Sequence, residues 1–519
     1  MSVSPPTPDS VLVVGAGPVG LVAACELARR GVTVRVVDKL MAPTNQSRAV
    51  AVHAASLEML DRLGVAEELI ATGVTSAGMK IVSGGSTLVT VPLDSIDSVY
   101  PFTLITAQTE TERVLTTRLE ALGASVERGR EVVDLTQDAD RVQVTVRTDS
   151  GDTETVDAGW VVAADGARSA TRHFLGTKLA DGDFHGHHFL LGDVDAHHHL
   201  GDVHMHTFLH PDGPVIALPM VGGRLRLVAQ LHNAPVTPPG AVPERAELQE
   251  ILDRRIGGVI ITRSHWLTGF EVKHGQVPRY RHGRVFLAGD AAHIHSPVGG
   301  QGMNTGMQDA ANLSWKLAAA VSGDGGQSLL DSYHTERHPI AKKVISFTSA
   351  LTRAGTLRGP VRKVRNTAAA VVGRSHFLTE RFADTLAELT VAYPHSPIIR
   401  RQAPRGAVVT AGHRFPYVNQ DITRSLFADA AGHTMLTVAG VAAAPAPPVG
   451  GRRHVLVADG ASPVDGYDAV VADPHHSVGR RLGLTSGGHV LCRPDGYIGA
   501  VLALGDEAGI ADYYATLER

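Results

Sequence analysis

Residues 10–20 read Ser-Val-Leu-Val-Val-Gly-Ala-Gly-Pro-Val-Gly, and residues 32–38 read Val-Thr-Val-Arg-Val-Val-Asp. The first apolar run predicts a buried strand, residues 18–30 predict a helix that ends before Gly31, and residues 32–37 predict a second strand. A strand, a glycine-rich turn, a helix and a second strand make a βαβ unit. The chain is therefore expected to open with a parallel sheet of the α/β class.

The glycines of this turn have the spacing of a nucleotide-binding loop. Gly15 permits the sharp turn, Gly17 lets a pyrophosphate approach the backbone, and Gly20 lets the helix pack against the strand. The start of the helix, including the Val19 amide, offers N–H donors and a positive dipole. Asp38 ends the second strand, where a carboxylate accepts hydrogen bonds from a ribose. Because this carboxylate disfavours a 2′-phosphate, we expect FAD or NAD as the resident nucleotide.

Length and composition set the outer limits. At roughly 150 residues per domain, 519 residues predict several units, and a hydrophobic content of 43% is enough to give them packed cores. Forty-eight basic against 52 acidic side chains leave a net charge of −4, which argues against a nucleic-acid partner held by bulk charge. Cys25 and Cys492 are too few for a disulfide framework or a thiolate zinc site, so we expect a reducing, cytoplasmic location.

The apolar run from Val11 to Cys25 has the length of a signal-peptide core but not its flanks. No Lys or Arg precedes it, since the first basic residue is Arg29, and its glycines and proline suit a turn. No other stretch reaches the ~18 apolar residues of a spanning helix. We therefore expect no membrane partner.

Two further motifs follow short predicted strands. Residues 160–169 read Trp-Val-Val-Ala-Ala-Asp-Gly-Ala-Arg-Ser, a strand followed by an Asp-Gly turn. From residue 283 a second strand ends in Gly-Asp290, and a glycine-rich loop then leads into a long helix predicted over 303–321. Asp290 stands where a carboxylate can bind a polyol hydroxyl. Developing negative charge would face the start of the long helix at Gly302, Met303 and Asn304.

The pattern of predicted secondary structure changes along the chain. Short alternating segments at 187–194, 203–209, 214–220 and 224–230 predict an antiparallel sheet inserted into the α/β unit. Short strands and helices return after about residue 405, with a clear hairpin of strands 488–493 and 497–502. We therefore divide the chain into a first part of the nucleotide-binding domain (1–175), a middle sheet domain (176–275), a second part with a helical linker (276–400) and a C-terminal domain (405–519).

Taken together, the three motifs resemble those of the FAD-dependent aromatic hydroxylases, the single-component flavoprotein monooxygenases of the para-hydroxybenzoate hydroxylase fold. The resemblance covers residues 9–345 well and the remainder more loosely. It is strongest to the larger members acting on phenols and polyketide-type aromatics, which carry a C-terminal thioredoxin-like domain without redox cysteines. It implies a Rossmann-like FAD-binding domain with an inserted antiparallel-sheet substrate domain, a helical linker and a thioredoxin-like C-terminal domain, and residues 405–519 contain no Cys-x-x-Cys.

The resemblance also implies a role for each motif residue. Gly15, Gly17, Val19 and Gly20 would hold the FAD pyrophosphate, and Asp38 would hold the adenosine ribose.

Further along the cofactor, Arg48 would contact the diphosphate, Gln108 would lie near the ribityl chain, and Asp290 would bind that chain. Asp165 and Arg168 match a motif implicated in contacts with FAD and with the pyridine nucleotide. The loop and helix start beside the isoalloxazine would be formed by Pro297, Gly300, Gly302, Met303 and Asn304.

The implied reaction has two halves. NADPH or NADH reduces FAD, and O2 then adds at flavin C4a to give a hydroperoxide that hydroxylates an electron-rich aromatic substrate. Because the flavin carries the chemistry, no side chain is singled out as catalytic. The sequence has no second glycine fingerprint, which fits transient binding of the pyridine nucleotide.

Several alternatives stay open. The same scaffold also supports Baeyer–Villiger-type oxygen insertion on a polycyclic ketone, a non-oxygenating flavin reductase, or a flavoprotein that sequesters an aromatic ligand. The preference between NADH and NADPH and the choice between monomer and homodimer are equally open.

Histidines are concentrated in the middle segment, with nine between His185 and His210. His204 and His206 would share one strand face, but no acidic spacing completes a metal site, and we expect none. His206, Met220 and Arg226 stand on strands that face the substrate in the family, so they are candidate substrate contacts, although each also suits ordinary sheet packing.

Overall fold

The computed structural model describes residues 10–44, 46–47, 49–181, 187–231, 242–272, 274–357, 359–427, 431–439 and 453–519. Two residues singled out by the sequence, Arg48 and His185, lie outside these described residues.

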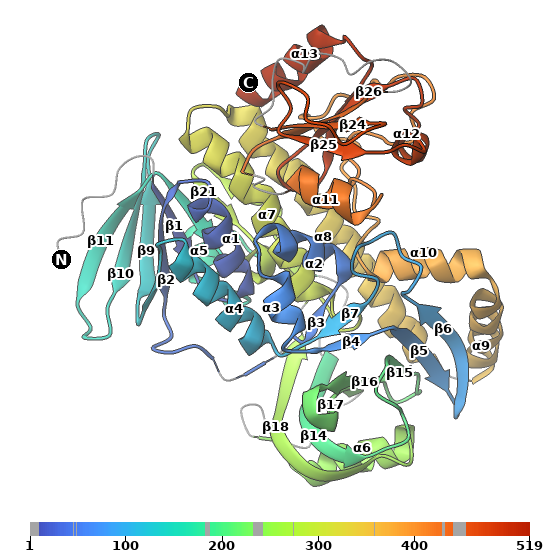
Figure 1. The fold of residues 1–519 in the computed structure, drawn as a ribbon. Helices are drawn as coiled ribbons and strands as arrows, with labels where there is room; N and C mark the ends of the chain where they lie inside the picture. Colours follow the sequence, from blue (N-terminus) through green and yellow to red (C-terminus); the bar gives the residue numbers. More distant parts are fainter. Residues whose placement is uncertain are drawn as a thin grey trace.

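A six-stranded sheet forms the centre of the N-terminal part of the molecule (Figure 1). Its strand order is β20-β21-β12-β1-β2-β8, and every neighbouring pair is parallel except β20 and β21. The predicted βαβ unit is confirmed, because β1 and β2 pair in parallel on either side of α1 in the sequence. The elements are β1 (Ser10–Val14), α1 (Pro18–Ala28), β2 (Thr33–Asp38), β8 (Val126–Arg128), β12 (Trp160–Ala163), β20 (Arg281–His282) and β21 (Val285–Leu287).

Helices cover one face of this sheet, and a small antiparallel sheet covers the other. Val11 and Val13 join the core formed with α1, α4 and α7. Leu12 and Val14 pack instead against β9, β10 and β11. Successive residues of β1 thus enter two different cores, which explains why the whole strand is apolar. These flanking elements are α4 (Gln108–Ala121), α7 (Gln301–Val321), β9 (Glu131–Gln137), β10 (Val142–Arg147) and β11 (Thr153–Ala158).

A seven-stranded sheet forms the middle of the molecule, with the order β18-β14-β17-β16-β15-β5-β6. All neighbours are antiparallel except β15 and β5. The four predicted segments appear as β14 to β17, but the sheet extends beyond residues 176–275, because β5 and β6 come from much earlier in the chain. The strands are β5 (Gly78–Ser83), β6 (Ser86–Pro92), β14 (His187–His197), β15 (His204–Phe208), β16 (Val215–Met220), β17 (Arg224–Leu231) and β18 (Ile260–Val272).

The two faces of the middle sheet bury different clusters. Leu190, Leu225 and Leu227 lie on one face and pack with α6 (Arg245–Arg255). The opposite face contributes to a second cluster that also contains residues of the nucleotide-binding part. We call this second set the inner apolar cluster; its buried members are Val50, Ala51, Met79, Ile105, Phe189, Leu191, Met205, Ile216, Leu218, Met220, Val228, Val298 and Leu386.

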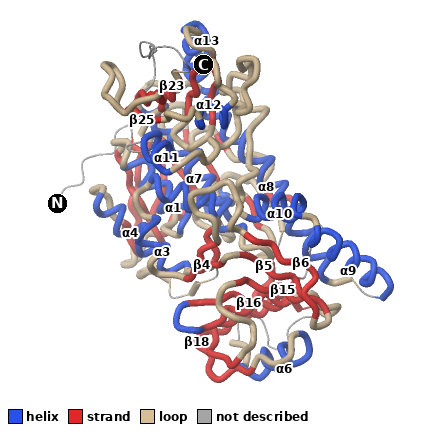
Figure 2. Tube along the Cα trace, turned by 45° about the vertical axis from the view of Figure 1, so that its right-hand side comes forward, coloured by secondary structure: helices blue, strands red, loops and turns tan. Residues whose placement is uncertain are grey.

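The remaining elements connect these layers. The helix predicted over 303–321 is confirmed as α7, which begins two residues earlier. After α8, the helices α9 and α10 pack along β6, and α9 projects at the edge of the molecule (Figure 2). These elements are α2 (Ala54–Arg62), α3 (Ala66–Ile70), α5 (Ala170–Phe174), α8 (Gln327–Gly355), α9 (Gly359–Arg374), α10 (His376–Leu386), β3 (Ala51–Val52), β4 (Val74–Ser76), β7 (Thr103–Ile105), β13 (Ala180–Asp181), β19 (Gly275–Gln276), β22 (His293–Ile294) and the short 3-10 turns η1 (Val221–Gly223) and η2 (Gly289–Ala291).

The C-terminal part contains its own five-stranded sheet, in the order β25-β24-β23-β26-β27. The pairs β23–β24 and β24–β25 are parallel, and β23–β26 and β26–β27 are antiparallel. The predicted hairpin is confirmed as β26 and β27. The elements are α11 (Gln420–Phe427), β23 (Thr434–Val438), β24 (Arg453–Ala458), β25 (Ala469–Ala472), α12 (Ser477–Leu482), β26 (Gly488–Cys492), β27 (Ile498–Leu502) and α13 (Glu507–Glu518).

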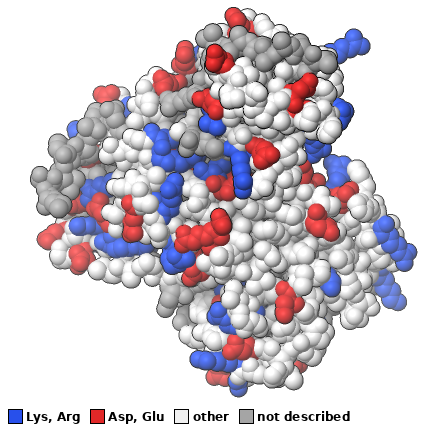
Figure 3. All heavy atoms as spheres, in the orientation of Figure 1, with Lys and Arg blue, Asp and Glu red and all other residues white. Residues whose placement is uncertain are grey.

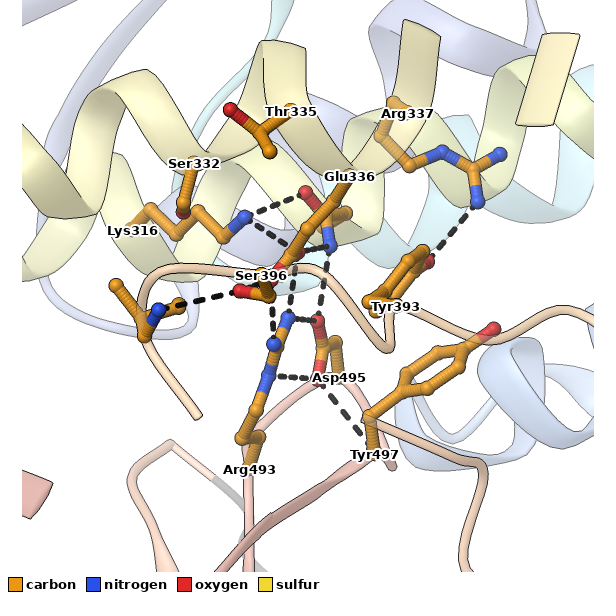
Figure 4. A network of polar contacts seen from close by, with 12 residues as sticks. Lys316, Ser332, Thr335, Glu336, Arg337, Tyr393, Ser396, Arg493, Asp495 and Tyr497 are labelled. Carbon is orange, nitrogen blue, oxygen red and sulfur yellow. Dashed lines mark hydrogen bonds and ion pairs between the residues drawn. The ribbon is translucent and has the colours of Figure 1, made fainter. Parts of the chain in front are cut away.

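A buried network of charges joins this C-terminal part to α7 and α8 (Figure 4). Lys316 Nζ lies 2.6 Å from Glu336 Oε2, and Arg493 Nη1 lies 2.7 Å from Glu336 Oε1. Asp495 accepts hydrogen bonds of 3.1 Å each from Asn312 Nδ2 and from the Trp315 indole. Because these groups are withdrawn from water and satisfy one another, the tip of the β26–β27 hairpin is fixed to the helices.

The surface is mixed in charge. Lys and Arg are interspersed with Asp and Glu over the face shown in Figure 3. Among the described residues, no helix combines the length and the apolar character needed to cross a bilayer.

Candidate functional site

Three loops meet at the carboxyl ends of adjacent strands. β1 leads into Gly15, β12 into Asp165 and β21 into Gly289, and the three strands are neighbours in the sheet. A β-carbon added at Gly15 would stand 2.4 Å from the Ala164 carbonyl oxygen, so the first two loops are in contact. The carboxyl ends of parallel strands are where α/β sheets bind ligands, and the three predicted motifs share that end.

The start of α1 rests directly on α7. A β-carbon would stand 2.9 Å from Val19 Cγ2 if added at Gly289, and 2.8 Å from it if added at Gly306. A side chain at either position would therefore force Val19 to shift. This contact brings the first motif against the third.

The glycines of the first loop differ in what they face. A β-carbon at Gly20 would overlap the Gly15 carbonyl oxygen at 1.9 Å, so Gly20 is required by packing. A β-carbon at Gly17 would meet nothing within 4 Å. The space in front of Gly17 is therefore open to an approaching ligand.

Neither α1 nor α7 receives a side-chain cap from the described residues, and neither has an acidic residue in its first turn. Ser169, Ser375 and Asp506 cap α5, α10 and α13, whereas α2 and α8 are uncapped like α1 and α7. The first N–H groups of an uncapped helix have no partner within the helix and favour a negative or electronegative group. The open space at Gly17 and the uncapped donors fit a pyrophosphate at α1.

The Asp38 carboxylate is held by hydrogen bonds, one of them from the glycine-rich loop after β1. Its Oδ2 accepts a hydrogen bond of 2.7 Å from Ala16 N, its Oδ1 accepts one of 2.8 Å from Leu40 N, and Arg128 lies 3.5 Å away. A carboxylate offers about four lone-pair sites, so capacity remains for ribose hydroxyls. The geometry fits the predicted ribose contact.

Gln108 begins α4 and holds the segment on both sides of residue 48. Its backbone N donates to Ser47 Oγ at 2.8 Å, and its Oε1 accepts from Ala49 N at 3.2 Å. Its Nε2 donates to Glu112 Oε1 at 2.8 Å. Gln108 thus positions the chain around the candidate arginine, and its own contact with a ribityl chain stays a prediction.

The Asp165 carboxylate is engaged within its own loop. It accepts hydrogen bonds from Ser169 Oγ at 2.5 Å and from Thr171 N at 3.0 Å, so it stabilises the start of α5. Arg168 is exposed, and its contact with a pyridine nucleotide stays a prediction. Sequence reasoning missed Arg172, which donates to Ala167 O at 2.7 Å and to Ala291 O at 3.1 Å and so ties the second loop to the third.

Asp290 is exposed on the 3-10 turn η2, where a polyol hydroxyl can reach it. The turn is fixed by Asp309 of α7, which accepts hydrogen bonds from Gly289 N at 3.2 Å and from Arg337 Nε at 2.6 Å and pairs with His293 at 2.6 Å. Burial alone would raise the pKa of Asp309, but Arg337 and His293 hold it below its usual value. One signal in the sequence could have found this residue, because Asp309 is the one carboxylate in a largely apolar helix.

The loop before α7 is built on glycines in the left-handed region, with φ of 89° at Gly299 and 65° at Gly300. Gly300 N donates to Pro297 O at 3.1 Å and closes the turn. Gly302 and Met303 follow as half-buried residues of the first helical turn.

The Asn304 side chain makes three hydrogen bonds to backbone groups of the protein. Its Oδ1 accepts from His53 N at 2.9 Å, and its Nδ2 donates to Ala51 O at 2.9 Å and to Gly300 O at 2.8 Å. All of these partners belong to segments that lead into α2 or α7. Asn304 therefore positions the start of α7, and its own contact with a flavin stays a prediction.

Met220 and Arg226 lie on the inner face of the middle sheet, as does Val228 of the inner apolar cluster. Arg226 is fully buried; its Nη2 donates to Asp193 Oδ2 at 2.7 Å, and its guanidinium lies 5.4 Å from the centre of the Trp266 ring. Asp193 and Trp266 were not singled out by the sequence, since their pairing with Arg226 depends on strand register.

His206 lies on the other face of that sheet. It pairs in register with Ala217, a member of the cluster under α6, and its ring stacks on Phe208 at 5.9 Å. Burial lowers the pKa of His206 to about 4. The structure thus separates His206 from Met220 and Arg226, because strand residues alternate between the faces.

The histidine-rich segment does not assemble a cation site within the part of the chain that the structure describes. No cluster of three or more His, Cys, Asp or Glu side chains suited to a metal ion occurs there.

Comparisons with known proteins agree with the geometry. Residues 9–348 match the family model described as FAD binding domain. The chain is 35% identical to 6-methylpretetramide 4-monooxygenase of Streptomyces rimosus over 96% of this chain and 91% of that protein. It is 34% identical to 12-dehydrotetracycline 5-monooxygenase/anhydrotetracycline 6-monooxygenase of Streptomyces rimosus subsp. rimosus over 94% of both. The solved structure of OxyS anhydrotetracycline hydroxylase from Streptomyces rimosus superposes with a TM-score of 0.75 over 98% of both chains, at 29% identity.

Proposed function

The chain belongs to the FAD-binding-domain family of flavin-dependent monooxygenases, and on that premise we propose that it hydroxylates a phenolic or polyketide-type aromatic compound with NADPH or NADH and O2. One observation carries the proposal: the uncapped start of α1 packs against Gly306, in the second turn of α7, at one end of the sheet, and Val298 of the loop before α7 belongs to the inner apolar cluster. The same arrangement thus offers a place for a dinucleotide and a buried apolar cluster next to it.

The residues around the first loop fit the adenosine half of FAD. The backbone at Gly15, Gly17, Val19 and Gly20 would hold the pyrophosphate, and Asp38 would hold the ribose. Toward the flavin, Arg48, Gln108, Asp165 and Asp290 would line the cofactor. These assignments are supported by the open face of Gly17 and by the exposure of Asp290.

The start of α7 would serve the flavin ring itself. When bound, FAD supplies the redox chemistry that transfers one oxygen atom from O2 to the substrate at the expense of NAD(P)H. The chain must supply a positive potential at the N1–C2=O edge of the ring, and the donors at Gly302 and Met303 suit that task. Pro297, Gly300 and Asn304 would hold these donors in position.

The inner apolar cluster would receive the aromatic substrate and exclude water from it. Within its surroundings the Arg226–Asp193 pair is the polar feature suited to a ring hydroxyl, because a buried guanidinium can donate to a phenolate oxygen. Met220 would line the same face. The names of the two relatives, 6-methylpretetramide 4-monooxygenase and 12-dehydrotetracycline 5-monooxygenase/anhydrotetracycline 6-monooxygenase, support a polyketide-type aromatic substrate.

The C-terminal part would be a thioredoxin-like domain that has no redox role. Its sheet, with two parallel pairs beside an antiparallel hairpin, supports this assignment. Cys25 and Cys492 are both buried and free, which suits a cytoplasmic protein. The domain would pack on its own chain, in a monomer or a homodimer.

The decisive experiment follows NADPH and NADH oxidation together with O2 uptake by the purified yellow protein. A panel of phenols, anthraquinones and polycyclic ketones is the test set. We expect an aromatic compound to accelerate both rates and to gain one oxygen, with NMR distinguishing a ring hydroxyl from an inserted ester oxygen. A protein that binds FAD but shows no compound-stimulated O2 uptake would refute the proposal.

A further inference from the structure

Glu388 is a buried carboxylic acid just beyond the end of α10. Its residue is 4% exposed, and its backbone has a φ of 60°. Left-handed backbone is uncommon and strained for a residue with a β-carbon. The contacts around Glu388 must therefore outweigh an unfavourable conformation.

Those contacts reach the start of α7. Thr305 Oγ1 donates to Glu388 Oε1 at 3.1 Å, and Gln308 Nε2 donates to the other carboxyl oxygen. One turn earlier, Gln301 Nε2 donates to Leu386 O at 3.1 Å. Three polar side chains on one face of α7 thus hold the segment 386–388.

The same segment also contacts the start of α2. Ala55 N donates to Ala387 O at 3.2 Å, and Gln308 Nε2 lies 3.3 Å from Ser56 Oγ. On its other side α10 contributes Phe382 and Leu386 to the inner apolar cluster. Glu388 therefore stands where the start of α7, the start of α2 and the wall of the proposed substrate region come together.

No ion pair to Glu388 is found among the described residues. Its direct donors, Thr305 and Gln308 on α7, are neutral, and the Ser56 hydroxyl of α2 accepts a hydrogen bond from Gln308 Nε2. The charged groups that act on it are Arg337 of α8 and Asp309 of α7, and these two are paired with each other. Burial raises the pKa of Glu388 to about 8, against the lowering effect of Arg337 and the two donors.

We propose that Glu388 is a positioning residue for the flavin: while it keeps its proton it braces the first turns of α7 without cancelling the positive end of that helix, and loss of the proton weakens FAD binding. The inference rests on the proposed function, because it requires FAD at the start of α7. A negative charge placed beside Thr305 and Gln308 opposes the helix potential that the flavin would use.

The test is the dissociation constant of FAD from the full chain, measured by flavin fluorescence between pH 6 and 9.5. For the unchanged protein we expect affinity to fall by roughly three- to tenfold from pH 7 to 9, the range of a helix-terminus charge effect. Glu388→Gln keeps the size of the side chain and cannot ionise, so its affinity should stay level over that range. Glu380→Gln, on the half-exposed surface of α10, is the matched control and should retain the fall.

A second variant makes the test independent of how well Glu388→Gln folds. Thr305→Val removes a hydrogen bond that favours the carboxylate, so the midpoint of the affinity loss should move to higher pH. If the unchanged protein, Glu388→Gln and Thr305→Val all bind FAD with the same pH dependence, the role of Glu388 is refuted while the proposed function stands. If none of them binds FAD at any pH, the proposed function itself fails.

Discussion

At the residue scale, Gly17 and Gly20 belong to one turn but are needed for different reasons, and alanine separates them. Gly17→Ala places a methyl in open space with an allowed φ of −78°, so we expect less than about 1 kcal/mol change in the free energy of unfolding. FAD affinity should nevertheless fall by about tenfold or more, because the methyl occupies the approach of the pyrophosphate.

Gly20→Ala should instead lower the free energy of unfolding strongly. Its β-carbon would overlap Gly15 O, and such overpacking costs about 3 kcal/mol or more in unfolding free energy. Urea unfolding of the apoprotein and FAD titration of each variant check both expectations. Equal FAD affinity in Gly17→Ala and the unchanged protein would contradict the assignment of Gly17.

A second prediction at the residue scale concerns the Arg226–Asp193 pair. It distinguishes the contribution of the pair to stability from its contribution to substrate binding. Arg226→Met leaves the Asp193 carboxylate without its partner and should cost about 3–5 kcal/mol of stability. The double variant Arg226→Met with Asp193→Leu replaces both charges by apolar groups and should recover most of that loss. Substrate-stimulated NAD(P)H oxidation should remain low in the double variant, with the increase falling mainly on KM. A double variant with unchanged KM would show that the pair is only structural.

The residues that sequence reasoning found are those whose role is local. Gly15, Gly20 and Asp38 follow from a turn and the strand that comes next, so their spacing alone predicts them. Asp309 and Arg172 were missed, because each acts on a loop far away in sequence. His206 was grouped with Arg226 because the strands were known but their faces were not, and a shift of one residue reverses a face.

At the scale of elements, α7 depends on a side chain that joins it to another segment. Asn304→Ala removes three hydrogen bonds and leaves His53 N and Ala51 O without partners, which should cost about 2–3 kcal/mol. Because those groups hold the start of α7, hydrogen exchange at the His53 amide should accelerate and FAD affinity should fall together. Asn312→Ala, on the same helix but facing Asp495, is a control that should leave the His53 amide protected.

The elements show the same limit of sequence reasoning as the residues. The βαβ unit, α7 and the β26–β27 hairpin were predicted from short patterns, because each pairs with chain close in sequence or repeats at helical spacing. The strands β5 and β6 were not assigned to the middle sheet. Their alternation predicts a half-buried strand but not its neighbour, and β5 pairs with β15 more than a hundred residues later.

At the scale of the molecule, the C-terminal part is joined to α7 and α8 through charged side chains that are buried away from water. Glu336 of α8, Lys316 of α7 and Arg493 of the hairpin are all fully buried (Figure 4). An intact buried ion pair adds little to the free energy of unfolding. Removing one partner is strongly destabilising, because the other charge remains buried without a counterion. The network therefore fixes the position of the β26–β27 hairpin. It also links the C-terminal part to α7, the helix that begins at the proposed flavin site.

Glu336→Gln tests this link, and its effect should depend on pH. Burial alone would raise the pKa of Glu336, but Arg493 and Lys316 hold it well below its usual range, so the folded state favours the carboxylate. Its contribution is then fully present above the unfolded pKa of about 4.3 and is lost as pH falls below that value. At pH 7 the variant should lose about 3–5 kcal/mol, and the difference from the unchanged protein should shrink between pH 4.5 and 3.5. Thermal unfolding with Glu380→Gln as the control measures this, and a difference that stays constant over that pH range would mean that the ion network does not hold the two parts together.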